Sequence, residues 1–178
     1  MSEADELAQR FVERRDERTF RLLYRKASPR VYAFLLRLVR LDHALAEDLL
    51  QETWVRAVRS LDQFRGAAQF LTWLTGIAFN VWRERARLDM RRPLHAIDET
   101  DESPGAELDL DQTIAFEQAL ATLNDDHRIV LILHDIEGFT HPEIAARLAV
   151  AEGTSKSRLS EARAALRTLL ARSEEKQR

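Results

Sequence analysis

The 178-residue sequence contains no cysteine, only five glycines and four prolines, and no long apolar run. The absence of cysteine excludes disulfides, thiolate metal sites and a cysteine nucleophile. Scarce glycine and proline, abundant Ala, Leu, Arg and Glu, and the lack of an alternating strand pattern together predict an all-α fold. The charged N-terminus does not resemble a signal peptide, and no stretch reaches the roughly 20 apolar residues of a membrane span. We therefore expect a cytoplasmic protein without membrane insertion, metal or cofactor.

The net charge of −3 is distributed unevenly along the chain. Residues 1–92 carry a net charge of +5, residues 93–122 carry −8, and residues 123–178 are neutral. Within the acidic part, residues 93–112 contain Pro93, Pro104 and Gly105 and show no apolar period. This composition predicts a flexible acidic linker between two small helical domains, 1–92 and 113–178. The linker is either a solvated spacer or an occupant of a channel built for nucleic acid.

The C-terminal third has the pattern of a helix-turn-helix. Apolar residues recur at helical spacing over residues 123–133, and the segment 137–139 (Glu-Gly-Phe) breaks that period. Thr140 and Glu143 then have capping-box spacing, which predicts a short helix over residues 141–148.

A long helix is expected to follow from Gly153, with one apolar side and one polar side. The apolar side consists of Leu159, Ala162, Leu166 and Leu169. The polar side near the helix start consists of Lys156, Ser157, Ser160 and Glu161. A short helix, a tight turn and a longer helix with an early polar face are typical of entry into a DNA major groove. The alternative is a helical hairpin with a solvated basic face.

The upstream residues predict further helices. Apolar spacing over residues 20–38 indicates a helical region that is interrupted or kinked at Ser28-Pro29. Asp42 is expected to cap a helix over residues 43–61. The outer face of that helix begins acidic and carries Glu47, Asp48, Gln51, Glu52 and Arg56.

A loop around Gly66, over residues 62–69, precedes another long helix whose character changes halfway. Phe70 and Trp73 are expected in the core. A basic surface follows, made of Asn80, Arg83, Arg85, Arg87, Arg91 and Arg92. Phe79 and Trp82 lie among these residues, which suits stacking on single-stranded nucleic acid beside backbone neutralisation, although Trp82 suits packing equally well.

Two separated segments resemble the extracytoplasmic-function (ECF) group of bacterial sigma factors. AEDLLQETWVRAVRSLDQFRGAAQFLTWLTGIAFNVWRERAR, spanning Ala46–Arg87, is similar to the second conserved region of that family. LNDDHRIVLILHDIEGFTHPEIAARLAVAEGTSKSRLSEARAAL, spanning Leu123–Leu166, is similar to its fourth. The resemblance implies a region two-like helical bundle, a region four-like helix-turn-helix domain, and a non-enzymatic subunit that gives RNA polymerase its promoter choice.

The resemblance also implies which residues carry each role. The clamp coiled coil of core RNA polymerase would be bound by Asp48, Gln51 and Glu52. The opened minus-ten strand would be held by Phe64, Arg65, Gly66, Ala67, Ala68, Asn80, Arg83, Arg85 and Arg87. The base edges of the minus-thirty-five element would be met by Lys156, Ser157, Ser160 and Glu161, while phosphate contacts or pairing within the domain would involve Thr140, Thr154, Arg158 and Arg163. A cognate anti-sigma factor is the further expected partner, beside core polymerase and promoter DNA.

Some residues depart from the family pattern. Ala67 and Ala68 stand where polar residues are common, and Glu161 stands where a basic residue is common. Ala149 replaces an expected turn glycine, and Ser155 replaces the usual valine. We therefore expect the helix-turn-helix to be retained and the preferred promoter sequence to differ.

Two other functions are considered. An autonomous helix-turn-helix regulator would explain the C-terminal half equally well, but not the acidic and the arginine-rich helices upstream. A helical metalloenzyme using His134, Asp135, Glu137 and His141 lacks a recognised ligand motif, since Glu137 and His141 lie on either side of a glycine turn.

Overall fold

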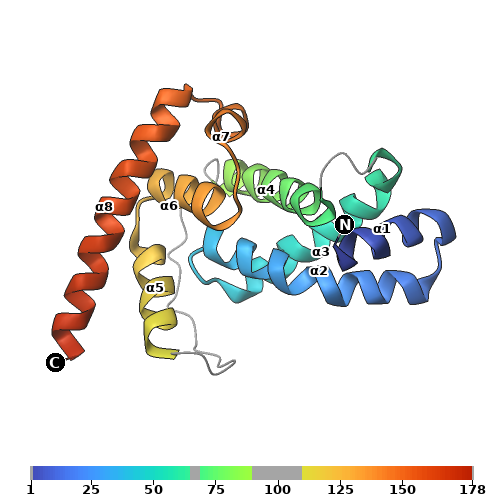
Figure 1. The fold of residues 1–178 in the computed structure, drawn as a ribbon, viewed down its shortest axis with the longest axis horizontal. Helices are drawn as coiled ribbons and strands as arrows, with labels where there is room; N and C mark the ends of the chain where they lie inside the picture. The colour runs from blue at the N-terminus through green and yellow to red at the C-terminus, as the bar shows by residue number, and fades with distance from the viewer. Residues whose placement is uncertain (1, 65–68, 90–109, 178) are drawn as a thin grey trace. The chain divides into compact units, whose positions relative to one another are not determined.

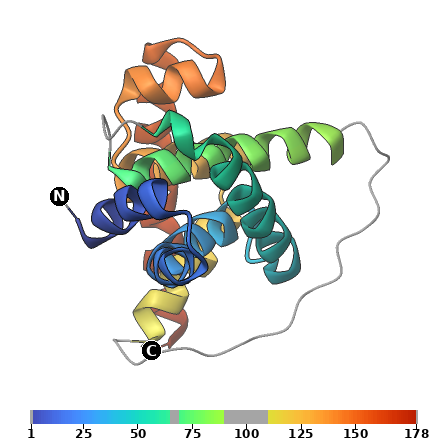
Figure 2. The ribbon, with the colours of Figure 1, turned by 90° about the vertical axis from the view of Figure 1, so that its right-hand side faces the viewer.

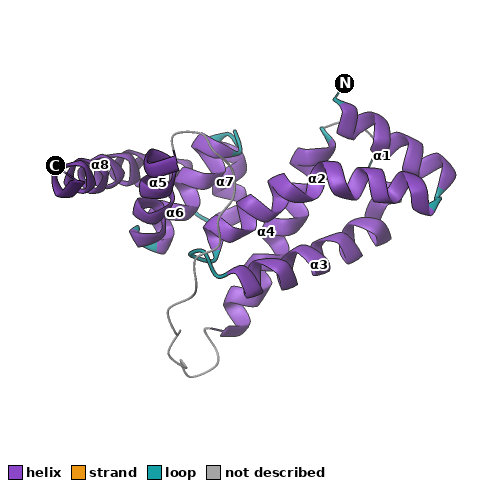
Figure 3. Ribbon diagram, turned by 90° about the horizontal axis from the view of Figure 1, so that it is seen from below, coloured by secondary structure: helices purple, strands orange, loops and turns teal. Residues whose placement is uncertain are grey.

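The computed structural model describes residues 2–64, 69–89 and 110–177. All regular structure within these ranges is helical, which confirms the predicted all-α fold (Figure 3). The chain divides into two compact units, Met1–Glu99 and Thr100–Arg178 (Figure 1). The predicted linker lies mostly outside the described residues, and helix α5 begins at Leu110, before the linker was expected to end.

The first unit is a bundle built around its second helix. The helices are α1 (Glu3–Arg14), α2 (Glu17–Leu38), α3 (His43–Ser60) and α4 (Phe70–Asp89), with a 3₁₀ turn at Leu61–Gln63. Helix α2 packs against the other three, and α4 (green) also crosses α3 (teal), as Figure 2 shows. The buried stripe of α2 consists of Leu23, Ala27, Val31, Phe34, Leu35 and Leu38. Burial of this stripe is the main favourable contribution to the bundle.

Helix α2 runs through Ser28-Pro29 without the interruption that was allowed from the sequence. Proline lacks the backbone N–H that would bond to the preceding turn, so the helix loses one internal hydrogen bond there. A hydrogen bond from another helix stabilises α2 at this point, because the indole nitrogen of Trp54 on α3 donates to the Ser28 hydroxyl at 2.9 Å. Tertiary contacts therefore hold α2 together where its local sequence disfavours a helix.

An aromatic cluster joins α2, α3 and α4 to Phe64, the residue that follows the 3₁₀ turn. The Trp54 ring contacts Phe20 and Tyr24 of α2 and Phe70 of α4, with ring centroids 5.1–6.3 Å apart. Phe70 is fully buried, as predicted, whereas Trp73 is only half-buried. Such pairs add to the stability that burial alone provides.

The second unit is organised around its last helix. The elements are α5 (Leu110–Thr122), α6 (Asp125–Leu131), a π-helical segment (Ile132–Ile136), α7 (His141–Leu148) and α8 (Glu152–Gln177). Helix α8 packs against α5, α6 and α7 (red in Figure 1). The predicted apolar side of α8 is confirmed for Leu159, Ala162 and Leu166, which are buried, whereas Leu169 is only half-buried.

Local signals around α7 are also confirmed. The Glu143 carboxylate accepts hydrogen bonds from the backbone amide and the hydroxyl of Thr140, at 2.8 and 2.7 Å, so the capping box begins the helix. Gly138 has φ of 76° in the turn before it. Ala149 ends α7 with φ of 57°, a conformation that glycine adopts at lower cost.

A buried carboxylate of the first unit links α1 to the start of α4. Asp5 Oδ1 accepts the backbone N–H of Phe70 at 2.7 Å, and its Oδ2 accepts the amide and hydroxyl of Ser2 at 2.7 and 2.8 Å. Desolvation raises the pKa of Asp5, but the hydrogen bonds from Phe70 and Ser2 together outweigh it and leave the pKa below its ordinary value.

Replacing Asp5 should therefore destabilise the first unit in a pH-dependent way. We expect Asp5→Ala to lower the free energy of unfolding by about 1–3 kcal/mol at pH 7, because it leaves the buried Phe70 amide without its acceptor. A carboxyl with a lowered pKa contributes stability above its unfolded value and loses it as the pH falls, so the difference from wild type should narrow below about pH 4.

Chemical denaturation between pH 3 and 7 would measure this difference. Glu6→Gln is the matched control, because Glu6 is an exposed carboxylate one position along the same helix. A constant difference across that pH range would contradict the assignment.

Candidate polymerase and nucleic-acid surfaces

The three residues predicted to bind polymerase lie together on the outer face of α3. Asp48, Gln51 and Glu52 are exposed, and the opposite side of the helix buries Leu49, Thr53 and Trp54. Val55 is an apolar residue beside them and is 44% exposed. Val55 was not predicted from the sequence, although it follows Gln51 by one helical turn.

Arg56 connects this surface to α4. Its guanidinium binds Glu52 Oε1 through Nε and Glu84 Oε2 through Nη1, both at 2.7 Å. Hydrogen bonds with Glu52 and then Glu84 raise the pKa of Arg56, so its charge persists at all ordinary pH values. The ion pair between Arg56 and Glu84 therefore connects α3 to α4 on the exposed side of the bundle.

The basic part of α4 borders an open groove. Asn80, Arg85 and Arg87 are exposed and Arg83 is half-buried, so these four residues of the predicted surface do lie at the surface of α4, whereas Arg91 and Arg92 lie outside the described residues. The groove between α3 and α4 is lined by Arg56, Arg59, Ser60, Ile77, Asn80, Arg83 and Glu84. The contribution of Arg59 and Ser60 was missed, although their spacing from Arg56 places them on one face of α3. The groove can hold a phosphate backbone among its guanidinium groups.

The aromatic residues around this groove differ from the prediction. Phe79 is fully buried and cannot stack on a base, so that part of the prediction is wrong. Its ring packs against Trp82, 5.4 Å away, and Trp82 remains half-buried. Phe64 packs against Phe70 and Trp73, with ring centroids 5.4 and 5.3 Å away, and so continues the aromatic cluster. The other predicted loop residues, Arg65, Gly66, Ala67 and Ala68, lie outside the described residues.

The predicted polar face of α8 is present in the second unit. Lys156, Ser157, Ser160 and Glu161 are all exposed, and Ser155 is buried on the opposite side. Lys156 forms an ion pair with Glu152 at 2.6 Å, one turn earlier. The Ser157 hydroxyl donates to the backbone oxygen of Thr154 at 3.1 Å. The helix thus presents one lysine, two hydroxyls and one carboxylate on a face available for base edges.

Two arginines of α8 are paired within the unit. Arg158 binds Asp126 Oδ2 at 2.7 Å, and Arg163 binds both oxygens of Asp135 at 2.6 and 2.8 Å. Hydrogen bonds from Arg163 lower the pKa of Asp135, and the same pair raises the pKa of Arg163. Phosphate contact and pairing within the domain were the two roles expected for these arginines, and in the structure both arginines are paired within the domain.

The residues of the metalloenzyme hypothesis form a structural contact instead. The rings of His134 and His141 stack with centroids 4.6 Å apart, and His141 Nδ1 lies 3.0 Å from the Ser155 hydroxyl. Burial lowers the pKa of His141, and the charges of His134 and Lys156 act in the same direction. Within the described part of the chain, no group of three or more histidines and carboxylates is arranged to hold a metal ion.

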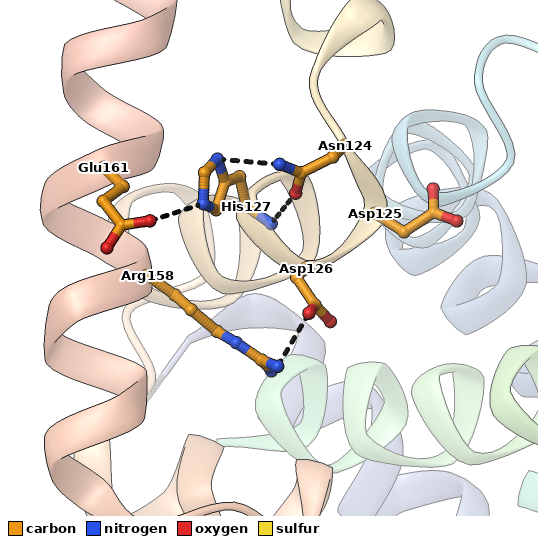
Figure 4. A pocket seen from close by; sticks show the side chains of 6 residues that line it. All are labelled: Asn124, Asp125, Asp126, His127, Arg158 and Glu161. Atoms are coloured by element: carbon orange, nitrogen blue, oxygen red, sulfur yellow. Dashed lines mark hydrogen bonds and ion pairs between the residues drawn. The ribbon is translucent and has the colours of Figure 1, made fainter.

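A second concave surface lies between the start of α6 and the middle of α8. It is lined by Asn124, Asp125, Asp126, His127, Arg158 and Glu161 (Figure 4). His127 lies between Asn124 and Glu161, and Arg158 reaches Asp126. The sequence suggested no role for Asn124 or His127, because Glu161, the residue on α8 that His127 contacts, lies more than 30 residues away along the chain.

No helix in the described ranges is long and apolar enough to cross a membrane.

Comparison with known proteins identifies both units. Residues 23–92 match the family model of sigma-70 region 2, and residues 113–166 match that of sigma-70 region 4. The chain is 33% identical over 155 residues to the RNA polymerase sigma factor CarQ of Myxococcus xanthus, covering 85% of this chain and 88% of that protein. It is 31% identical over 170 residues to the ECF sigma-E factor of Escherichia coli, covering 87% and 88%.

Two similar solved structures are complexes with a second protein. One is the sigma factor RpoE with the anti-sigma factor NepR from Bartonella quintana, with a TM-score of 0.64 and 31% identity, covering 85% of this chain and 96% of that one. The other is CnrH with the cytosolic domain of CnrY, with a TM-score of 0.59 and 26% identity, covering 95% and 98%. The sequence match to both regions, in order and over most of the chain, shows that the chain belongs to the extracytoplasmic-function group of RNA polymerase sigma factors.

Proposed function

We propose that this chain is an alternative sigma factor that binds core RNA polymerase and directs promoter-specific initiation. The observation that carries the proposal is that each region matching the family exposes a polar face on a helix whose other side is buried. These faces belong to α3 and α4 in the first unit and to α8 in the second. Sigma factors are initiation factors, so the surfaces act by binding and not by catalysis.

In this proposal the outer face of α3 binds the polymerase. Asp48 and Glu52 supply carboxylates that suit a basic partner, and Val55 supplies an apolar contact at the same patch. Glu52 is already held by Arg56, so its carboxylate is fixed before the partner arrives. Pre-ordering of this kind reduces the entropy lost on binding.

The groove between α3 and α4 is assigned to the opened minus-ten strand. Arginines along the groove neutralise phosphates, and Asn80 provides an amide for a base edge. Strand opening needs only tighter binding of the melted state than of the duplex, since unstacking a base costs a few kcal/mol. Base capture by the loop residues 65–68 remains part of the proposal.

Helix α8 is assigned to the minus-thirty-five element. Residues 123–178 carry no net charge, and several of their cations are already paired with carboxylates. Weak counterion release makes weak unaided binding to duplex DNA the expected behaviour. Tight promoter binding then requires that polymerase and the first unit engage the same DNA molecule, which raises the effective concentration of α8.

A cognate anti-sigma factor is the proposed regulator. The structurally similar sigma factor RpoE is bound by the anti-sigma factor NepR, and the structurally similar CnrH is bound by the cytosolic domain of CnrY. An anti-sigma protein that covers the α3 surface or the α8 face of this chain would block binding to polymerase or to promoter DNA.

Substitutions on the α3 surface should weaken core binding selectively. We expect the double variant Asp48→Ala, Gln51→Ala to reduce affinity for core polymerase about tenfold or more, as is common when central interface residues are truncated. Fluorescence anisotropy of labelled protein titrated with core polymerase measures this. Glu13→Ala, an exposed carboxylate on α1, is the control. Equal affinity of the double variant and the control would contradict the assignment.

Substitutions in the groove should reduce promoter opening. Asn80→Ala and Arg59→Ala, at two residues that line the groove, are expected to slow opening of duplex promoters, and Arg59→Ala should reduce the salt dependence of binding by about 0.7–0.9 in log–log slope for the lost phosphate contact. Permanganate reactivity of minus-ten thymines reports the opened strand.

Two comparisons make the groove test specific. A promoter carrying a pre-opened minus-ten bubble should restore much of the activity of Asn80→Ala, and Arg18→Ala, an exposed arginine on α2, should behave as wild type. Normal opening by both groove variants would refute the role of the groove.

A further inference from the structure

A series of hydrogen bonds that starts at the beginning of α6 ends on Glu161 of α8, one of the residues at which this sequence departs from the family pattern. The Asn124 side-chain oxygen accepts the backbone N–H of His127 at 2.8 Å and thereby caps α6. The Asn124 amide nitrogen lies 3.1 Å from His127 Nδ1, and His127 Nε2 lies 3.1 Å from Glu161 Oε2. These contacts span the concave surface of Figure 4.

The geometry determines the direction of each bond. Because the Asn124 oxygen is used by a backbone amide, its NH₂ group faces His127 and donates to Nδ1. An imidazole that accepts at Nδ1 carries its hydrogen on Nε2, and that hydrogen is directed at the Glu161 carboxylate. The three side chains are therefore joined by two hydrogen bonds, from Asn124 to His127 and from His127 to Glu161.

Burial differs sharply between His127 and Glu161. The side chain of His127 is 18% exposed, whereas that of Glu161 is 64% exposed. His127 is thus held by packing and by Asn124, and it restrains a carboxylate that faces solvent. Oε2 of Glu161 accepts the hydrogen bond from His127. Within the described residues, Oε1 makes no hydrogen bond, so it is available to accept one from a partner molecule.

We propose that Asn124 and His127 are positioning residues that hold Glu161 to accept a hydrogen bond from the N4 amine of a cytosine in the minus-thirty-five element. This inference rests on the proposed function. A glutamate accepting from cytosine is a recognised major-groove contact. DNA phosphates repel a carboxylate, and a hydrogen bond from a base donor offsets that repulsion. A carboxylate that is held in place cannot turn away from a base that lacks the donor, so it discriminates against other bases more strongly than a mobile carboxylate does.

A neighbouring ion pair offers a matched control. Arg158 also binds the first turn of α6, through Asp126 at 2.7 Å, and so joins the same two helices. Asp126→Asn weakens that connection without touching the carboxylate of Glu161. General loosening of α8 and specific positioning of Glu161 can therefore be separated.

The experiment uses the full chain with core polymerase on a set of promoters in which each minus-thirty-five base pair is changed in turn. Wild type should prefer cytosine about tenfold at one position, and Glu161→Ala should abolish that preference, because alanine has no acceptor for the cytosine amine. His127→Phe removes the donor, and Asn124→Ser keeps a capping side chain but removes the NH₂ group. Both should reduce the preference at that same position at least threefold and leave preferences elsewhere unchanged.

Double substitution tests the coupling. In the Glu161→Ala background, His127→Phe should produce no further change in base preference, and Asp126→Asn alone should retain the cytosine preference. The inference is overturned if His127→Phe and Asn124→Ser keep the wild-type preference, or if they lower transcription equally from every promoter. Failure of wild-type protein to bind core polymerase or to initiate at any promoter would instead refute the proposed function itself.

Discussion

Burial of one stripe on each functional helix determines which side chains the other side presents. In α8, the buried side chains Ser155, Leu159 and Ala162 leave Lys156, Ser157 and Ser160 facing outward. In α3, burial of Leu49 and Trp54 turns Asp48 and Gln51 to the surface in the same way. Because a helix rotates by about 100° per residue, a change in core register would move every binding residue. Packing and recognition therefore depend on the same spacing.

Ion pairs and hydrogen bonds between helices add a second layer of order. Arg56 joins α3 to α4, Arg163 joins α8 to the π-helical segment, and His127 joins α6 to α8. Exposed pairs of this kind contribute little to stability. Their effect is to restrict side chains that the proposed function places at polymerase or DNA, so specificity gains more from them than folding does.

Local signals predicted much of the fold. Asp42 accepts the Leu45 amide at 2.9 Å as the expected cap of α3, and the capping box of Thr140 and Glu143 begins α7 where it was expected. Contacts between residues distant in sequence could not be predicted in this way. The burial of Phe79, the continuity of α2 through Pro29 and the choice of Asp126 as the partner of Arg158 all depend on residues from other helices. The helical period was enough to predict which residues form the polar faces of α3, α4 and α8. It could not predict which residues of other helices bond to those side chains and restrain them.

Transcription by purified core polymerase tests the central claim most directly. Core enzyme with this protein should produce run-off transcripts from a limited set of promoters in a library of genomic fragments, and core enzyme alone should produce none of them. Mapped start sites should share sequence elements near minus ten and minus thirty-five. Failure to bind core polymerase, or transcripts identical with and without the protein, would contradict the account.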